Sequence, residues 1–213
     1  MLNKNFLDYK IVEYTNLDSG CINIINKIEN ESIDSNVWQV ISQNNRQKNN
    51  AIDFGKLLAI DNFALPSVDL QTLEGNKYLL KNNLDKSSYK AIIDYVNDER
   101  INMSISNIWT SGEDPGSINS IGWNILKYEQ GDVLKTDSFY FSSKRDGLPL
   151  LTIIFFINDN YEGGQILFKD RLGNVPYRPK ANSMLIFPAT DEYQYKVLPV
   201  TSGIKYSAIT FAD

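Results

Sequence analysis

The sequence has no histidine among its 213 residues. Without an imidazole the chain cannot build a serine–histidine triad or a cysteine–histidine pair, so nucleophilic catalysis of those kinds is excluded. It also cannot supply the imidazole ligands on which many metal sites depend. The one cysteine, Cys21, cannot form a disulfide within the chain, and its apolar neighbours predict a small buried side chain.

Long apolar runs and basic clusters are lacking as well. Leu148–Ile157 has the length of a strand, far short of the roughly 20 residues of a membrane helix. The first ten residues have no apolar signal-peptide core. The net charge is −5, and Lys144–Arg145 and Arg178–Lys180 are isolated basic pairs. We therefore expect no membrane or nucleic-acid partner, and a protein that is not secreted but cytoplasmic or part of a virion.

What is present is the composition of a folded soluble protein. Hydrophobic residues make up 42% and charged residues 22% of the chain, enough for a core within a single domain spanning residues 1–213. The chain has 24 asparagines, 24 isoleucines and only five arginines, a bias typical of low-GC genomes such as those of many bacteria and phages.

The first 100 residues predict a helix-rich support region. Tyr9–Thr15 alternates as a strand does, and Ile22–Ile33 has isoleucines at helical spacing. Ser87–Arg100 carries the apolar stripe of an amphipathic helix, for which Asp85 or Ser87 would be the N-cap. Leu57–Leu84 is expected to be helix and loop.

Beyond residue 100 the spacing of apolar residues changes to that of strands. Short alternating or apolar runs are separated by turn signals such as Glu-Asp-Pro-Gly and Gly-Gly. Helices followed by such strands predict an α+β, mainly β protein, with a β-sandwich or jelly-roll core in residues 101–213. The predicted strands are Met103–Trp109, Ser120–Tyr128, Leu150–Asn158, Gly164–Lys169, Ser183–Pro188, Tyr193–Pro199 and Lys205–Phe211.

Four local motifs follow one another in this half of the chain. The first, at 128–139, is YEQGDVLKTDSF, and the second, at 151–164, is a strand that runs into a turn with paired glycines, LTIIFFINDNYEGG. The third, at 177–188, is YRPKANSMLIFP, and the fourth, at 195–206, is YKVLPVTSGIKY. In this order they resemble the core of the 2-oxoglutarate and Fe(II)-dependent dioxygenases of the prolyl 4-hydroxylase-like branch, over Trp123–Asp213.

The resemblance implies a double-stranded β-helix, or jelly roll, backed by the N-terminal helices. In the family, iron is held by two histidines and one carboxylate. Counted from Gly131 without a gap, Asp137 occupies the position of the first histidine and Phe139 that of the aspartate. With a two-residue deletion, Asp137 would keep the carboxylate role instead. Tyr195 occupies the position of the distal histidine, so at most one of the three ligands is kept.

Lys205 and Tyr128 match the residues that bind 2-oxoglutarate in the family. The resemblance implies that Lys205 pairs with the distal carboxylate, as a vestigial cofactor site, and that Tyr128 donates to the same group. The alternative is a strand lysine that meets a neighbouring carboxylate or extends to solvent, beside a core tyrosine. Gly163 and Gly164 are expected to serve their turn, and Phe155–Phe156 to fill the core.

Paired carboxylates are the remaining candidates for acid–base chemistry. Glu113–Asp114 and Asp191–Glu192 both lie in turn-like contexts, which favours solvated side chains over catalytic ones. The sequence also has no phosphate-binding Gly-Lys-Ser/Thr loop and no Cys-x-x-Cys.

These observations predict a protein that is not an enzyme but a pseudoenzyme of the dioxygenase family, with no catalytic residue, no bound metal and no required cofactor. Its expected role is structural or protein-binding, as a homo-oligomer or part of a larger assembly such as a phage virion neck, tail or capsid. Two alternatives stay open. One is an active 2-oxoglutarate-dependent oxygenase with an atypical metal site around Asp137 and Tyr195, and the other is a metal-free 2-oxoglutarate sensor.

Overall fold

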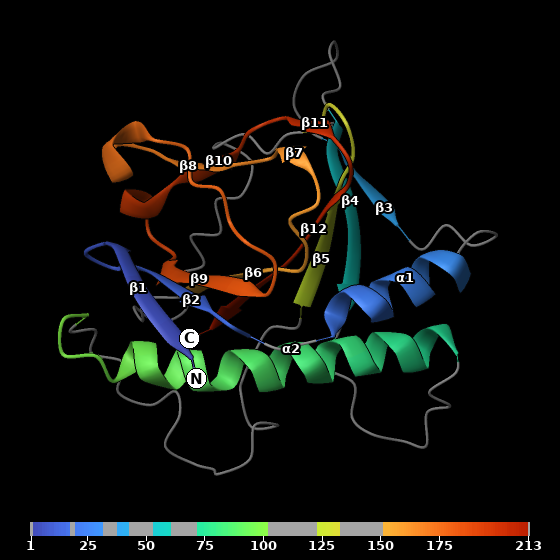
Figure 1. The fold of residues 1–213 in the computed structure, drawn as a ribbon, viewed down its shortest axis with the longest axis horizontal. Helices are drawn as coiled ribbons and strands as arrows, with labels where there is room; N and C mark the ends of the chain where they lie inside the picture. The colour runs from blue at the N-terminus through green and yellow to red at the C-terminus, as the bar shows by residue number, and fades with distance from the viewer. Residues whose placement is uncertain are drawn as a thin grey trace.

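An eight-stranded antiparallel sheet organises the computed structural model, which describes residues 2–17, 20–31, 38–42, 53–60, 72–101, 123–132 and 151–212. Two helices lie along one face of this sheet, and short strand pairs lie over the other (Figure 1). The strand order is β1-β2-β9-β6-β12-β5-β4-β3. The small pairs are β10 with β8 and β11 with β7.

The elements, in chain order, have the following bounds. The N-terminal part contains β1 (Asn3–Asp8), β2 (Ile11–Thr15), α1 (Cys21–Glu31), β3 (Gln39–Ser42), β4 (Asp53–Ile60) and α2 (Leu73–Val96). The C-terminal part contains β5 (Trp123–Tyr128), β6 (Leu151–Phe156), β7 (Glu162–Gly163), β8 (Ile166–Phe168), η2 (Leu172–Asn174), β9 (Ser183–Pro188), η3 (Asp191–Tyr193), β10 (Tyr195–Val197), β11 (Val200–Ser202) and β12 (Lys205–Ala212).

The central strands are buried on both faces because helices cover one face and the small strand pairs cover the other. All six residues of β6 and all six of β9 are buried. Since successive side chains of a strand point to opposite faces, Phe155 belongs to the core under the helices while Phe156 belongs to the core inside the sandwich. The apolar run at 151–157 is thus a doubly covered strand.

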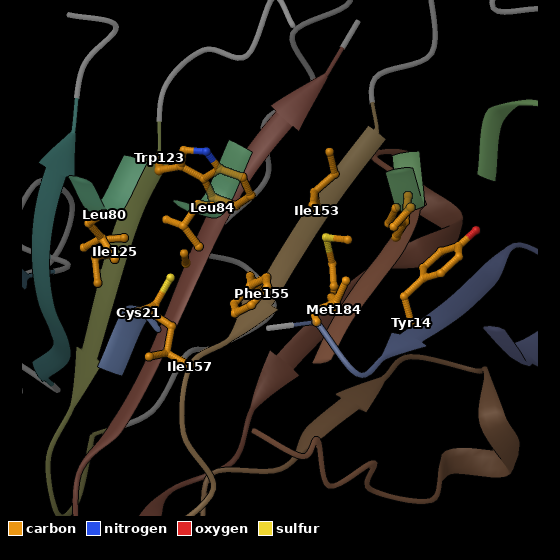
Figure 2. Packing of buried hydrophobic residues seen from close by; sticks show 14 of the residues in the cluster. Tyr14, Cys21, Leu80, Leu84, Trp123, Ile125, Ile153, Phe155, Ile157 and Met184 are labelled. Carbon is orange, nitrogen blue, oxygen red and sulfur yellow. The ribbon is translucent and has the colours of Figure 1, made fainter. Parts of the chain in front are cut away.

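The helix-side core is shown in Figure 2. Trp123, Ile125, Ile153 and Phe155 project from the sheet toward apolar residues of the two helices, among them Leu84. Full burial of an aliphatic or aromatic side chain of this size stabilises the fold by about 1.5–3 kcal/mol. Cys21, at the start of α1, is fully buried in the same cluster, as its apolar neighbours predicted.

Helix α2 differs from the prediction at its start. It begins at Leu73, where the Thr72 side chain caps it by accepting a 3.2 Å hydrogen bond from the Gly75 backbone N–H. Asp85 is therefore a mid-helix residue, not an N-cap. Its Oδ1 accepts a 2.8 Å hydrogen bond from Nε1 of Trp123, which ties the helix to β5.

Most of the predicted strands and helices are confirmed within the described residues. β2, α1, β5, β6, β8, β9, β10 and β12 all fall within or beside the predicted segments. The predicted strand Met103–Trp109 lies outside the described residues. Among those that are described, no helix is long and apolar enough to span a membrane. The mainly β jelly roll backed by helices is also confirmed.

Candidate functional site: the interior of the sandwich

Lys205 and Tyr128 stand opposite each other in the ladder between β12 and β5. Tyr128 belongs to the inner core, and Lys205 shares its strand face with Ile209, which belongs to the same core. Both side chains therefore project between the large sheet and the small strand pairs. The sequence prediction that placed these two residues in one site is consistent with this pairing.

Lys205 is a buried cation with one backbone partner. It is 1% exposed, and its Nζ donates a 2.6 Å hydrogen bond to the backbone oxygen of Gly164. Aromatic rings surround the same atom, with centroids 5.5 Å away for Tyr128, 5.7 Å for Phe156 and 5.8 Å for Tyr161. No carboxylate of the described residues pairs with it, in contrast to the solvent-facing or carboxylate-paired lysine that was the alternative.

Burial lowers the pKa of Lys205 to about 7, because a charged ammonium is poorly stabilised away from water. The positive charge of Arg178 lowers it further. An anionic ligand bound beside Nζ would favour the charged form and raise this pKa.

Tyr128 carries a second hydrogen-bond donor, its phenol hydroxyl, on a ring that borders Nζ of Lys205. Its hydroxyl is buried and has no hydrogen-bond partner among the residues that the structure describes. Burial raises the pKa of Tyr128, and the nearby Tyr195 and Asp132 raise it further, so the phenol keeps its proton. Because a buried donor without an acceptor costs about 1–3 kcal/mol, an acceptor group bound here would remove a penalty that the folded chain carries.

The paired glycines are needed for packing as well as for their turn. Gly163 and Gly164 both have positive φ, as predicted. A Cβ at Gly164 would lie 3.0 Å from Cε2 of Tyr161 and 3.2 Å from Cδ of Lys205. The backbone at this point therefore approaches the lysine more closely than any side chain would permit.

Tyr195, which stands at the position of the distal histidine, lies in an aromatic cluster. Its ring centroid is 6.0 Å from that of Phe168 and 5.6 Å, edge to face, from that of Phe187. Burial raises the pKa of Tyr195, which disfavours the phenolate that would bind a metal. Asp137 and Phe139, the other two ligand positions, lie outside the described residues, as does Glu113–Asp114.

Of the paired carboxylates that the sequence suggested, Glu192 can be placed on the surface. Glu192 is exposed and pairs at 3.5 Å with Arg171, so it is a surface residue. A surface hollow of about 670 Å³ lies away from Lys205, between β1 and the end of α2. Several of its charged residues pair with one another, as Lys4 does with Asp98 at 2.6 Å.

The residues present do not fit the iron site of the dioxygenases. The whole chain lacks the two histidines that such a site needs, and the described residues contain no group of three potential metal-ligating side chains. The 2-oxo acid site is different, because an ammonium and an unpartnered phenol remain side by side inside the sandwich. These two groups fit a carboxylate.

Sequence reasoning missed two members of this group. Phe156 was predicted to be core and is so, but it also borders Nζ of Lys205. Tyr161 was not singled out, and its position beside the paired glycines was the one signal that could have found it.

Both the sequence of the C-terminal part and the fold of the chain resemble those of known oxygenases. Residues 123–213 match the sequence model of the 2OG-Fe(II) oxygenase superfamily. Among solved structures, a prolyl hydroxylase from Trichoplax adhaerens, in complex with a hypoxia inducible factor peptide fragment, has a TM-score of 0.61 and 16% identity. That match covers 96% of this chain and 83% of the other. No curated protein matches.

Two further structures share the fold. A 2OG-Fe(II) oxygenase family oxidoreductase from Burkholderia pseudomallei has a TM-score of 0.58 and 10% identity, and the match covers 100% of this chain and 93% of the other. A viral collagen prolyl hydroxylase from Paramecium Bursaria Chlorella virus-1, in a 2OG complex, has a TM-score of 0.54 and 13% identity, with 95% and 94% covered.

These findings correct one prediction and confirm another. The expectation of a protein that is not an enzyme is wrong, because the matching family is one of oxygenases and the proteins that share its fold include prolyl hydroxylases. That expectation rested on the missing histidines alone. The resemblance read from the four motifs is confirmed: residues 123–213 match the sequence model of the 2OG-Fe(II) oxygenase superfamily, and the chain shares the fold of prolyl hydroxylases.

Proposed function

We propose that this protein is a 2-oxoglutarate-dependent oxygenase in which Lys205 and Tyr128 hold the distal carboxylate of 2-oxoglutarate. The observation that carries the proposal is the buried, carboxylate-free ammonium of Lys205, opposite the unpartnered phenol of Tyr128. A carboxylate accepts hydrogen bonds from both groups and offsets the desolvation of the lysine. The superfamily match supports an oxygenase reaction.

The substrate class follows from the neighbours and is part of the proposal. A structure that shares this fold was solved with a peptide fragment bound, and another is a collagen prolyl hydroxylase. We propose a protein segment as the substrate, which agrees with the protein partner expected from the sequence. The role in a virion or other assembly stays a prediction.

A metal site in this oxygenase would differ from the family's site of two histidines and one carboxylate. With no histidine in the chain, donors to a metal would be side-chain or backbone oxygen atoms, or the sulfur of Cys21 or of the three methionines. Bound 2-oxoglutarate would supply two of the four electrons that reduce O2, itself being oxidised to succinate and CO2, and the substrate would supply the other two. Lys205 and Tyr128 bind and orient the end of the molecule that does not react.

Two measurements test the proposal. Calorimetric titration of 2-oxoglutarate into protein purified anaerobically, with and without Fe(II), should give saturable binding that weakens roughly 10- to 100-fold in Lys205→Met, as expected for a charge-assisted contact. Absence of binding at millimolar ligand would refute the carboxylate site. Succinate formation with Fe(II), oxygen and 2-oxoglutarate tests the reaction, and a rate equal to that without protein would refute the oxygenase assignment.

A further inference from the structure

Tyr161 is a further aromatic residue beside Lys205. It lies outside the β12–β5 strand pair that contains Lys205 and Tyr128. It lies in the segment between β6 and β7, just before the paired glycines. Its ring centroid is 5.8 Å from Nζ of Lys205, almost the distance of the Tyr128 ring at 5.5 Å. Tyr161 and Tyr128 thus border the same ammonium from different elements.

Within the described ranges, the buried hydroxyl of Tyr161 has no hydrogen-bond partner, like that of Tyr128. The side chain is only 3% exposed. Buried tyrosine hydroxyls normally find an acceptor in the folded chain. The rings of Tyr128 and Tyr161 thus both border Lys205, and neither hydroxyl has a partner among the described residues, so an anion with several acceptor positions would offer both of them a partner.

Arg178 and Gly164 hold the Tyr161 ring in place. Arg178 donates hydrogen bonds to the backbone oxygens of Tyr161 and Asp159, and its guanidinium carbon lies 5.3 Å from the Tyr161 ring centroid. On the other side, the absence of a side chain at Gly164 lets the ring pack against the backbone, because a Cβ there would lie 3.0 Å from Cε2. The fold therefore fixes a ring whose hydroxyl has no hydrogen-bond partner in the described part of the chain.

We propose that Tyr161 is a third donor of the acid site and selects ligands with a carboxylate at the end distant from the 2-oxo group. This inference rests on the proposed function. A carboxylate has about four lone-pair positions, enough for the Lys205 ammonium and both phenols together. Phe156, the third ring near Nζ with its centroid at 5.7 Å, has no polar atom and adds no donor.

The test compares two ligands of equal chain length by calorimetry. 2-Oxoglutarate carries the distal carboxylate, and 2-oxovalerate carries a methyl group in its place. We expect Tyr161→Phe to weaken 2-oxoglutarate binding roughly five- to tenfold, the factor for one hydrogen bond, and to leave 2-oxovalerate binding unchanged. A merely structural role would weaken both ligands equally.

Tyr193→Phe is the matched control, since Tyr193 is also buried and stacked by an arginine, Arg171, at 4.6 Å. It should bind 2-oxoglutarate as the wild type does. Wild-type binding with an unchanged affinity in Tyr161→Phe, or equal weakening of both ligands, would overturn the role of Tyr161 alone. Failure of the wild type to bind 2-oxoglutarate would overturn the proposed function and this inference with it.

Discussion

Lys205 donates its 2.6 Å hydrogen bond to the backbone oxygen of Gly164, a residue 41 positions earlier in the chain. This contact joins the last strand of the large sheet to the turn that leads into the small strand pairs. It places the Lys205 ammonium between the large sheet and the small strand pairs.

Lys205→Met should stabilise the protein while it abolishes tight 2-oxoglutarate binding. At pH 6 the wild type buries a charged ammonium without a carboxylate partner, and replacing it with an apolar side chain of similar size should raise the free energy of unfolding by about 1–4 kcal/mol. Urea unfolding of both proteins at pH 6 measures the difference. A variant less stable than the wild type at that pH would contradict the prediction.

The advantage of Lys205→Met should shrink as the pH rises. The pKa of Lys205 is about 7 in the folded protein and is lowered from an ordinary value of 10.5. Between these values the unfolded chain binds a proton that the folded chain does not, so the wild type gains about 1.4 kcal/mol of unfolding free energy per pH unit. Below pH 7 this contribution is flat. Unfolding curves of both proteins at pH 7, 8 and 9 should therefore converge, and parallel pH profiles would contradict this.

Binding of 2-oxoglutarate should take up a proton above pH 7. Because the ligand pairs with the charged form of Lys205, whose pKa is about 7, affinity should fall about tenfold between pH 6 and pH 8. Calorimetry at pH 8 in two buffers of different ionisation enthalpy gives the number of protons directly. An identical apparent binding enthalpy in both buffers would show that no proton is exchanged.

Gly164→Ala should disturb the site, whereas Gly173→Ala should not. Both glycines have nearly the same positive φ, +64° and +62°, so both variants carry a similar backbone penalty of about 1 kcal/mol. A Cβ at Gly173 meets nothing within 4 Å, but one at Gly164 would press on Tyr161 and Lys205. We expect at least tenfold weaker 2-oxoglutarate binding in Gly164→Ala alone. Equal effects of the two substitutions on affinity would rule out the packing argument.

The sequence predicted the strands better than the helices, for a local reason. Strand alternation and the turns around β6 and β9 are properties of neighbouring residues, and these strands lie where expected. The start of α2 was missed because its cap, Thr72, precedes a first turn with Gly75 and Asn76, which are poor helix formers. Strand β4 was missed because its pairing with β5 is distant in sequence and its apolar residues are interrupted by Gly55 and Lys56.

The site was predictable where it lies on a strand and not where it depends on a loop. Lys205 and Tyr128 could be named from the order of motifs. Tyr161 lies near them because of the turn at Gly163–Gly164, which packs against the segment before β11. There the Gly164 N–H donates a 2.9 Å hydrogen bond to the backbone oxygen of Pro199. The expectation that the protein is not an enzyme was wrong for a related reason. The absence of histidine bears only on the metal ligands, and not on the other residues of the site.

The strand order determines the smallest fragment of this protein that should fold without aggregating. The superfamily match begins at residue 123, yet β2 pairs with β9 and β4 pairs with β5, so strands from before residue 100 close the sheet on both sides. A fragment limited to residues 123–213 would present two bare strand edges and an uncovered apolar face, the features from which aggregates grow. Expression and crystallisation should therefore keep β1 through α2 attached.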